Sequence, residues 1–66
     1  MKDLAILKYM LEHNVQHAQE LSETGARLAD AGLVLAAEKI GCAVSHFNNA
    51  NQCLEEAIKL AVSGGE

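Results

Sequence analysis

The sequence contains no proline, no tryptophan and only two aromatic residues, Tyr9 and Phe47. Strands favour aromatic and β-branched residues, so this shortage argues against a β-sheet fold. Without proline, the chain also lacks the residue that most strongly breaks a helix. Alanine and leucine, both good helix formers, are abundant in its place. We therefore expect an all-α fold, and 66 residues allow one domain at most.

Basic residues are few, and the net charge is −4. They are scattered along the chain and form no stripe that could neutralise successive phosphates, so we expect no nucleic-acid partner. The apolar run 4–7 is too short for a signal peptide or a membrane span, which predicts a cytoplasmic protein with no membrane partner. The five basic residues are Lys2, Lys8, Arg27, Lys39 and Lys59.

The two cysteines, Cys42 and Cys53, are spaced too widely for a disulfide within one helix. Eleven residues at 1.5 Å per residue place them roughly 16 Å apart, whereas a disulfide needs less than about 7 Å between Cα atoms. We expect them to behave as small buried hydrophobic residues. A disulfide between two chains stays open.

Apolar residues recur at intervals of three and four, which predicts two amphipathic helices. With Asp3 as its N-cap, the first helix is expected over about 4–30, and the second over about 34–62. Gly32 can adopt a left-handed conformation that ends the first helix, so residues 31–33 form the turn. Residues 63–66 are expected to be a disordered tail. A short connection makes the two helices antiparallel.

Two helices alone leave apolar surface uncovered, so the hairpin is expected to dimerise into a four-helix bundle. A second copy of the chain is the expected partner, and a different protein as partner remains an alternative. Gly25 costs helix stability of up to about 1 kcal/mol relative to alanine. It is either a weak point of the first helix or a place where the two backbones approach closely.

The candidate site lies in the first helix, where His13, His17 and Glu20 follow one another at i, i+4 and i+7. Two imidazoles at i and i+4 can share a transition-metal ion, and a carboxylate one turn further can add a ligand. In a hairpin that turns at 31–33, opposed positions sum to about 64 or 65, which sets His46 level with His17. The predicted metal ligands are His13, His17, Glu20 and His46, for Ni, Zn or Co.

A second interpretation assigns the same residues a purely structural or partner-binding role. Asn14 and Asn51 occupy places in the two apolar stripes and fall opposite each other. A buried asparagine layer can fix the register and the number of chains in a helical bundle. Neither interpretation involves catalysis, because no thiol or histidine has the neighbours that nucleophilic chemistry needs. We therefore expect a protein that is not an enzyme.

Two segments resemble a family of short, uncharacterised prokaryotic helical-hairpin domains. The first, Glu12 to Glu20, has the pattern E-H-N-x-x-H-A-x-E, and the second, Ala50 to Ala57, has the pattern A-N-x-x-L-E-x-A. The resemblance covers most of residues 4–60. It implies the hairpin fold and a joint role for His13, Asn14, His17 and Glu20, but it does not distinguish a metal site from a structural polar layer.

Overall fold

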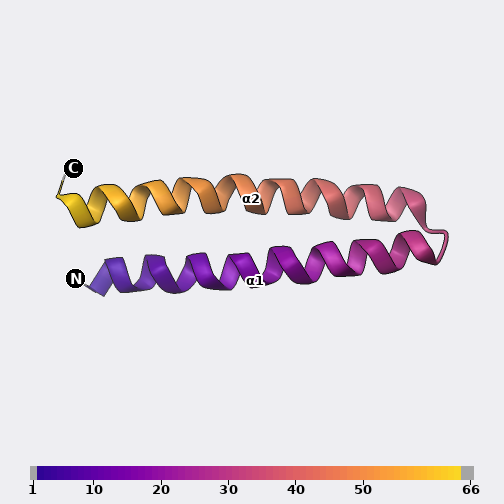
Figure 1. Ribbon diagram of the computed structural model, residues 1–66, viewed down its shortest axis with the longest axis horizontal. Coiled ribbons are helices and arrows are strands. Elements are labelled where there is room, and N and C mark those ends of the chain that lie inside the picture. The colour runs from indigo at the N-terminus through magenta and orange to yellow at the C-terminus, as the bar shows by residue number, and fades with distance from the viewer. Residues whose placement is uncertain (1, 65–66) are drawn as a thin grey trace.

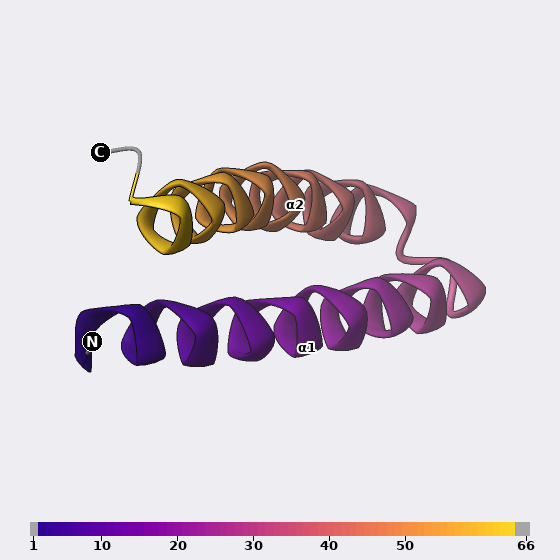
Figure 2. The same ribbon diagram turned by 60° about the vertical axis from the view of Figure 1, so that its left-hand side comes forward.

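The computed structural model describes residues 2–64, which form two α-helices. Helix α1 spans Lys2–Asp30 and helix α2 spans Val34–Ser63. The helices run antiparallel and side by side over their whole length (Figures 1 and 2). The predicted all-α, two-helix antiparallel hairpin is therefore confirmed for the single chain.

The turn between the helices has the hydrogen bonds of a Schellman motif. Gly32 has a φ of +86°, the left-handed conformation predicted for it. Its amide donates to the carbonyl oxygen of Ala29 at 3.0 Å, and the amide of Leu33 donates to that of Leu28 at 2.9 Å. These bonds satisfy carbonyl groups that a helix end would otherwise leave free, and they reverse the chain within three residues.

The outer ends of the helices differ from the sequence-based expectation. Helix α1 begins at Lys2, so Asp3 lies inside its first turn and is not the N-cap. A carboxylate there still interacts favourably with the helix dipole. Helix α2 continues to Ser63, and Gly64 follows as a left-handed C-cap with a φ of +71°. Residues 65 and 66 of the expected tail lie outside the described residues.

The two helices meet along one seam, in which buried and half-buried residues recur at intervals of three and four. A Cβ atom added to Gly25 would lie 3.2 Å from Cγ2 of Ile40, so these two positions face each other. Their numbers sum to 65, and extending this register along the two antiparallel helices pairs the other seam positions by the same sum. The α1 seam is Leu4, Leu7, Leu11, Asn14, Ala18, Leu21, Gly25 and Leu28; the α2 seam is Ala37, Ile40, Val44, Phe47, Asn51, Leu54, Ile58 and, exposed at the open end, Ala61.

Gly25 is therefore a close-approach site, one of the two alternatives left open by the sequence. Helix α1 runs unbroken through it. A side chain at this position would have to displace Ile40, whose branched Cβ makes it stiff. Glycine lets the two backbones come together at this level of the seam.

The hairpin has almost no enclosed core. Among residues 2–64, only Ala18 and Asn51 are buried, each with 7% of its surface exposed. The radius of gyration is 15.1 Å, compared with about 11 Å for a compact domain of this length. The prediction that the cysteines are buried is wrong, because Cys42 and Cys53 are both exposed. Two cylinders in contact along one line enclose too little space to bury them.

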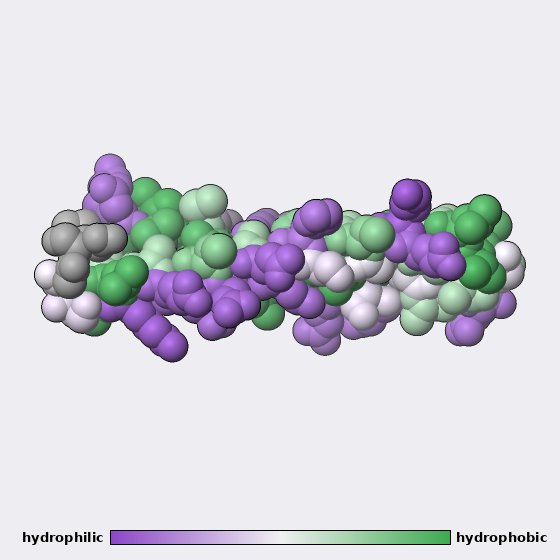
Figure 3. Space-filling model, turned by 90° about the horizontal axis from the view of Figure 1, so that it is seen from above, coloured by the Kyte–Doolittle hydropathy of each residue, from purple (hydrophilic) through white to green (hydrophobic). Residues whose placement is uncertain are grey.

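Large hydrophobic side chains remain exposed at both ends of the rod. On the face seen in Figure 3, the most strongly hydrophobic patches lie toward the two ends, and hydrophilic residues lie beside and between them. Over residues 2–64, neither helix has an apolar stretch long enough to cross a membrane. The exposed large hydrophobic residues are Ile6, Tyr9, Met10, Val15, Leu33, Val34, Leu35, Leu60 and Val62.

Candidate functional site

Three rings follow one another on the surface of α1, one turn apart. The rings of His13 and His17 lie edge to face, with their centroids 4.4 Å apart. Tyr9, one turn before, stacks on His13 with a centroid separation of 5.6 Å. The i, i+4 spacing on a helix produces this arrangement directly. The two imidazoles predicted to act together are therefore neighbours on one face.

His17 links this row of rings to the seam and to Glu20. Its ring centroid lies 6.4 Å from that of Phe47, the nearest aromatic residue on α2. Its Nδ1 atom lies 3.4 Å from Oε1 of Glu20, where the two side chains are 48% and 71% exposed. Because both groups are solvated, this contact contributes little to folding stability. It does orient the imidazole.

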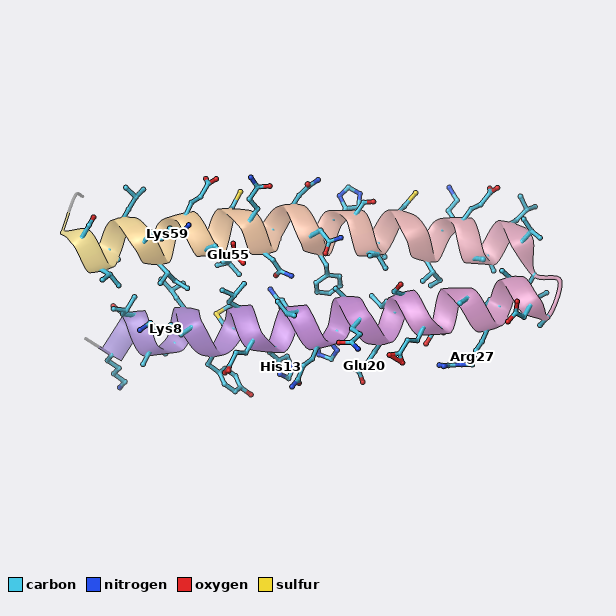
Figure 4. All side chains as sticks on the ribbon, in the orientation of Figure 1. Lys8, His13, Glu20, Arg27, Glu55 and Lys59 are labelled. Atoms are coloured by element: carbon cyan, nitrogen blue, oxygen red, sulfur yellow. The ribbon has the colours of Figure 1, made fainter. Side chains whose placement is uncertain are left out.

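A short chain of hydrogen bonds continues from Glu20 toward the turn. The Thr24 hydroxyl donates to the backbone carbonyl of Glu20 at 2.9 Å, and Nη2 of Arg27 donates to the Thr24 hydroxyl at 3.0 Å. His13, Glu20 and Arg27, each seven residues apart, lie in a row on the side of α1 away from α2 (Figure 4). Within residues 2–64, no side-chain hydrogen bond crosses from one helix to the other.

The fourth predicted ligand, His46, is exposed on α2. In the part of the chain that the structure describes, no three or more His, Cys, Asp or Glu side chains are placed to hold one metal ion. The structure thus brings His13 and His17 together, adds Glu20 beside His17, and does not add His46. Being level with His17 along the hairpin is not sufficient, because the seven-residue repeat turns His46 outward.

A polar layer interrupts the seam at Asn51, which the register sets opposite Asn14. Asn51 is buried and Asn14 is half-buried. The Oδ1 atom of Asn51 is buried and has no hydrogen-bond partner among residues 2–64. A buried acceptor without a donor costs about 1–3 kcal/mol. The hairpin therefore carries a cost at the level of its histidine rings.

Sequence reasoning missed one member of this cluster. Tyr9 lies four residues before His13, the same interval that separates the two histidines. This spacing on a helix is the signal that could have identified it. It extends the row of rings by one turn and shields one face of His13.

Comparison with known proteins assigns the chain to a family. Residues 4–61 match the family model described as Domain of unknown function (DUF8180). This match covers most of the chain, so the protein belongs to that family, in agreement with the resemblance seen in its two sequence patterns. No curated protein and no solved structure matches the chain significantly.

Proposed function

We propose that this member of the DUF8180 family is an interaction module whose hairpin pairs with a second copy to form a four-helix bundle. The proposal assigns it the role of joining chains, not of catalysing a reaction. When two hairpins form a four-helix bundle, the apolar faces that a single hairpin leaves half-covered are enclosed in the core between the four helices.

The observation that carries this proposal is the excess surface of the single chain. Its accessible area is 4982 Å², whereas a compact monomer of 7.0 kDa exposes about 4,000 Å². The excess, roughly 1,000 Å², is close to the area of about 800 Å² that each partner buries in a stable protein–protein interface. One interface of standard size would thus give each chain the surface expected of a folded protein.

Sedimentation equilibrium over a wide range of protein concentrations tests this proposal. We expect the mass to rise from the 7.0 kDa of one chain to twice that value, and the melting temperature to rise with concentration. Circular dichroism on the same samples reports whether the helices persist. A helical species with the mass of one chain at every concentration would contradict self-association.

A second candidate function is transition-metal binding at His13 and His17. The specific observation in its favour is the edge-to-face contact of the two rings at 4.4 Å. A helical pair of imidazoles can supply two nitrogen ligands to Zn, Ni or Co. Glu20, which orients His17, can act as a further ligand or hold the imidazole in place.

Metal content of the purified, untagged protein, measured by plasma mass spectrometry, tests this candidate. We expect bound Zn, Ni or Co in the unaltered chain and none in the His13→Ala/His17→Ala double variant. A Gln16→Ala/Gln19→Ala variant, altered on the same exposed helix, should keep the metal. A metal-free protein that stays metal-free after soaking in each ion would rule the candidate out.

A further inference from the structure

The two sides of the hairpin that flank the seam differ in composition. On one side, α2 presents an alanine every seven residues, and α1 presents Met10, His17 and Thr24 at the matching positions. We call this side the alanine face. The opposite side carries Lys8 and Glu55 among its central positions, and both lie toward the open end in Figure 4. The four alanines are Ala36, Ala43, Ala50 and Ala57.

The alanine face is the better surface for a second helix to pack against. None of its central positions is charged, and alanine lets helices approach to the short end of the 8–10 Å range of interaxial distances. At the open end, Ile6, Met10 and Leu60 lie on it or along its edges, and each is 46–48% exposed. The excess accessible area of the chain indicates how much surface a partner must cover. In a symmetric dimer, the same surface is buried on both chains.

Size complementarity selects one arrangement of the two copies. If α1 packs on the partner's α2, the large residues Met10 and His17 meet alanines at both contacts. If α1 instead packs on the partner's α1, the large residues of the two α1 helices face each other. The alanines of the two α2 helices then face each other at the second helix–helix contact. Bundles pack best when large and small residues alternate across facing positions. In the first arrangement the two-fold axis is parallel to the helices. Each residue therefore lies at the same height along the axis in both copies.

The seam register then determines which residues meet at the outer edge of this contact. Opposed levels sum to 65, so the partner's Cys53 falls about one residue, roughly 1.5 Å, from the level of His13. The partner's His46 falls equally close to Glu20. Ile6 and the partner's Leu60 form an apolar pair in the same row. Arg27 and the partner's Lys39 are like charges, which cost little at a solvated rim.

We infer that a second copy packs on the alanine face and supplies its Cys53 to the metal site that His13 and His17 begin, with its His46 beside Glu20. This inference rests on the proposed self-association. Two imidazole nitrogens and one thiolate are a donor set that suits Zn or Co. The two-fold axis gives the dimer two such sites. It explains why one chain holds only two of the ligands together.

The two cysteines, both exposed, provide an internal test. The seven-residue repeat places Cys53 at the outer edge of the alanine face and Cys42 opposite the seam. The full-length reduced protein is alkylated with iodoacetamide, with and without ZnCl₂, at concentrations where the dimer forms. We expect Cys53 to react at least about tenfold more slowly in the zinc-loaded dimer, since a metal-bound thiolate is a poor nucleophile. Cys42 should react at an unchanged rate.

Titration with CoCl₂ reports the ligand directly. We expect sulfur-to-cobalt charge-transfer absorption in the unaltered protein and in Cys42→Ser, and its loss in Cys53→Ser and in His13→Ala. A dimer that lacks this absorption, and whose two cysteines react at equal rates with zinc, would overturn the inference while leaving self-association intact. A chain that stays monomeric at every concentration, with or without metal, would overturn both.

Discussion

Toward the turn, three of the four seam pairs set a large side chain against a small one, whereas toward the open end two of the three pairs set large residues against each other. Gly25 faces Ile40 in the first region, and the register sets Ala18 opposite Phe47. In the second region the register sets Leu11 opposite Leu54. The turn half thus closes through approach of the backbones, and the open half through burial of leucine side chains. The Asn14–Asn51 layer separates the two.

This contrast predicts that the turn half depends on its single aromatic residue. The register sets Phe47 opposite the small Ala18, and its ring centroid lies 6.4 Å from that of His17. Phe47→Ala should lower the free energy of unfolding by about 2–3 kcal/mol, at the low end for phenylalanine because the side chain is half-buried. Urea unfolding at one fixed protein concentration measures the loss. Phe47→Leu is the matched control and should lose less than half as much.

The open half should respond less to loss of one side chain. Leu11→Ala removes one member of a leucine pair and should lower the free energy of unfolding by about 1–2 kcal/mol. The same urea titration measures it, with Val15→Ala, an exposed position on the same helix, as a control near zero. A larger loss for Leu11→Ala than for Phe47→Ala would reverse the comparison between the two halves.

The polar layer between them should reduce stability and improve specificity. Replacing both partners by leucine removes the unpaired Oδ1 of Asn51 and should raise the free energy of unfolding by about 1 kcal/mol. A rise in melting temperature by several degrees measures this gain. Sedimentation should at the same time show more than one oligomer, because no buried polar layer then restricts the number of chains in the bundle. A lower melting temperature for Asn14→Leu/Asn51→Leu would mean that the two amides stabilise the hairpin.

The smallest expected effects come from two helical glycines that differ only in their surroundings. A Cβ at Gly25 would lie 3.2 Å from Ile40, whereas one at Gly41 would have no atom within 4 Å. Gly41→Ala should raise the free energy of unfolding by about 0.5–1 kcal/mol through helix propensity. Gly25→Ala should show no gain, because the contact with Ile40 offsets it. Thermal melts of both variants decide the matter, and equal gains would mean that the backbones are not in close approach.

Most of the fold could be predicted from the sequence, because the information is periodic or local. Intervals of three and four residues indicate both helices, and Gly32 indicates a left-handed residue at the turn. From the turn, simple counting sets Asn14 opposite Asn51 and His17 level with Phe47.

The errors arise where the structure depends on more than one local signal. Asp3 is a good N-cap residue, but nothing before it prevents the helix from starting at Lys2. Cys42 and Cys53 are of a type that is usually buried, but a two-helix rod has no interior to bury them.

The candidate site was predicted only in part. The i, i+4 spacing brings His13 and His17 together because it acts within one helix. The addition of His46 required the angular positions on two helices to agree, and counting along the chain fixes only the level. In our proposal the further ligands come from a second chain, and no pattern within one chain encodes how that chain packs.

The three-residue turn also makes the two ends of the rod different from each other. Because the two helices are nearly equal in length, α1 begins and α2 ends at the same end of a molecule 49 Å long (Figure 1). In a bundle whose two-fold axis lies along the helices, all four of these helix ends gather at one pole, and both turns form the other. A tag or domain fused at either terminus would emerge beside its counterpart on the partner, so this geometry would bring fused cargoes together in pairs and leave the opposite pole free.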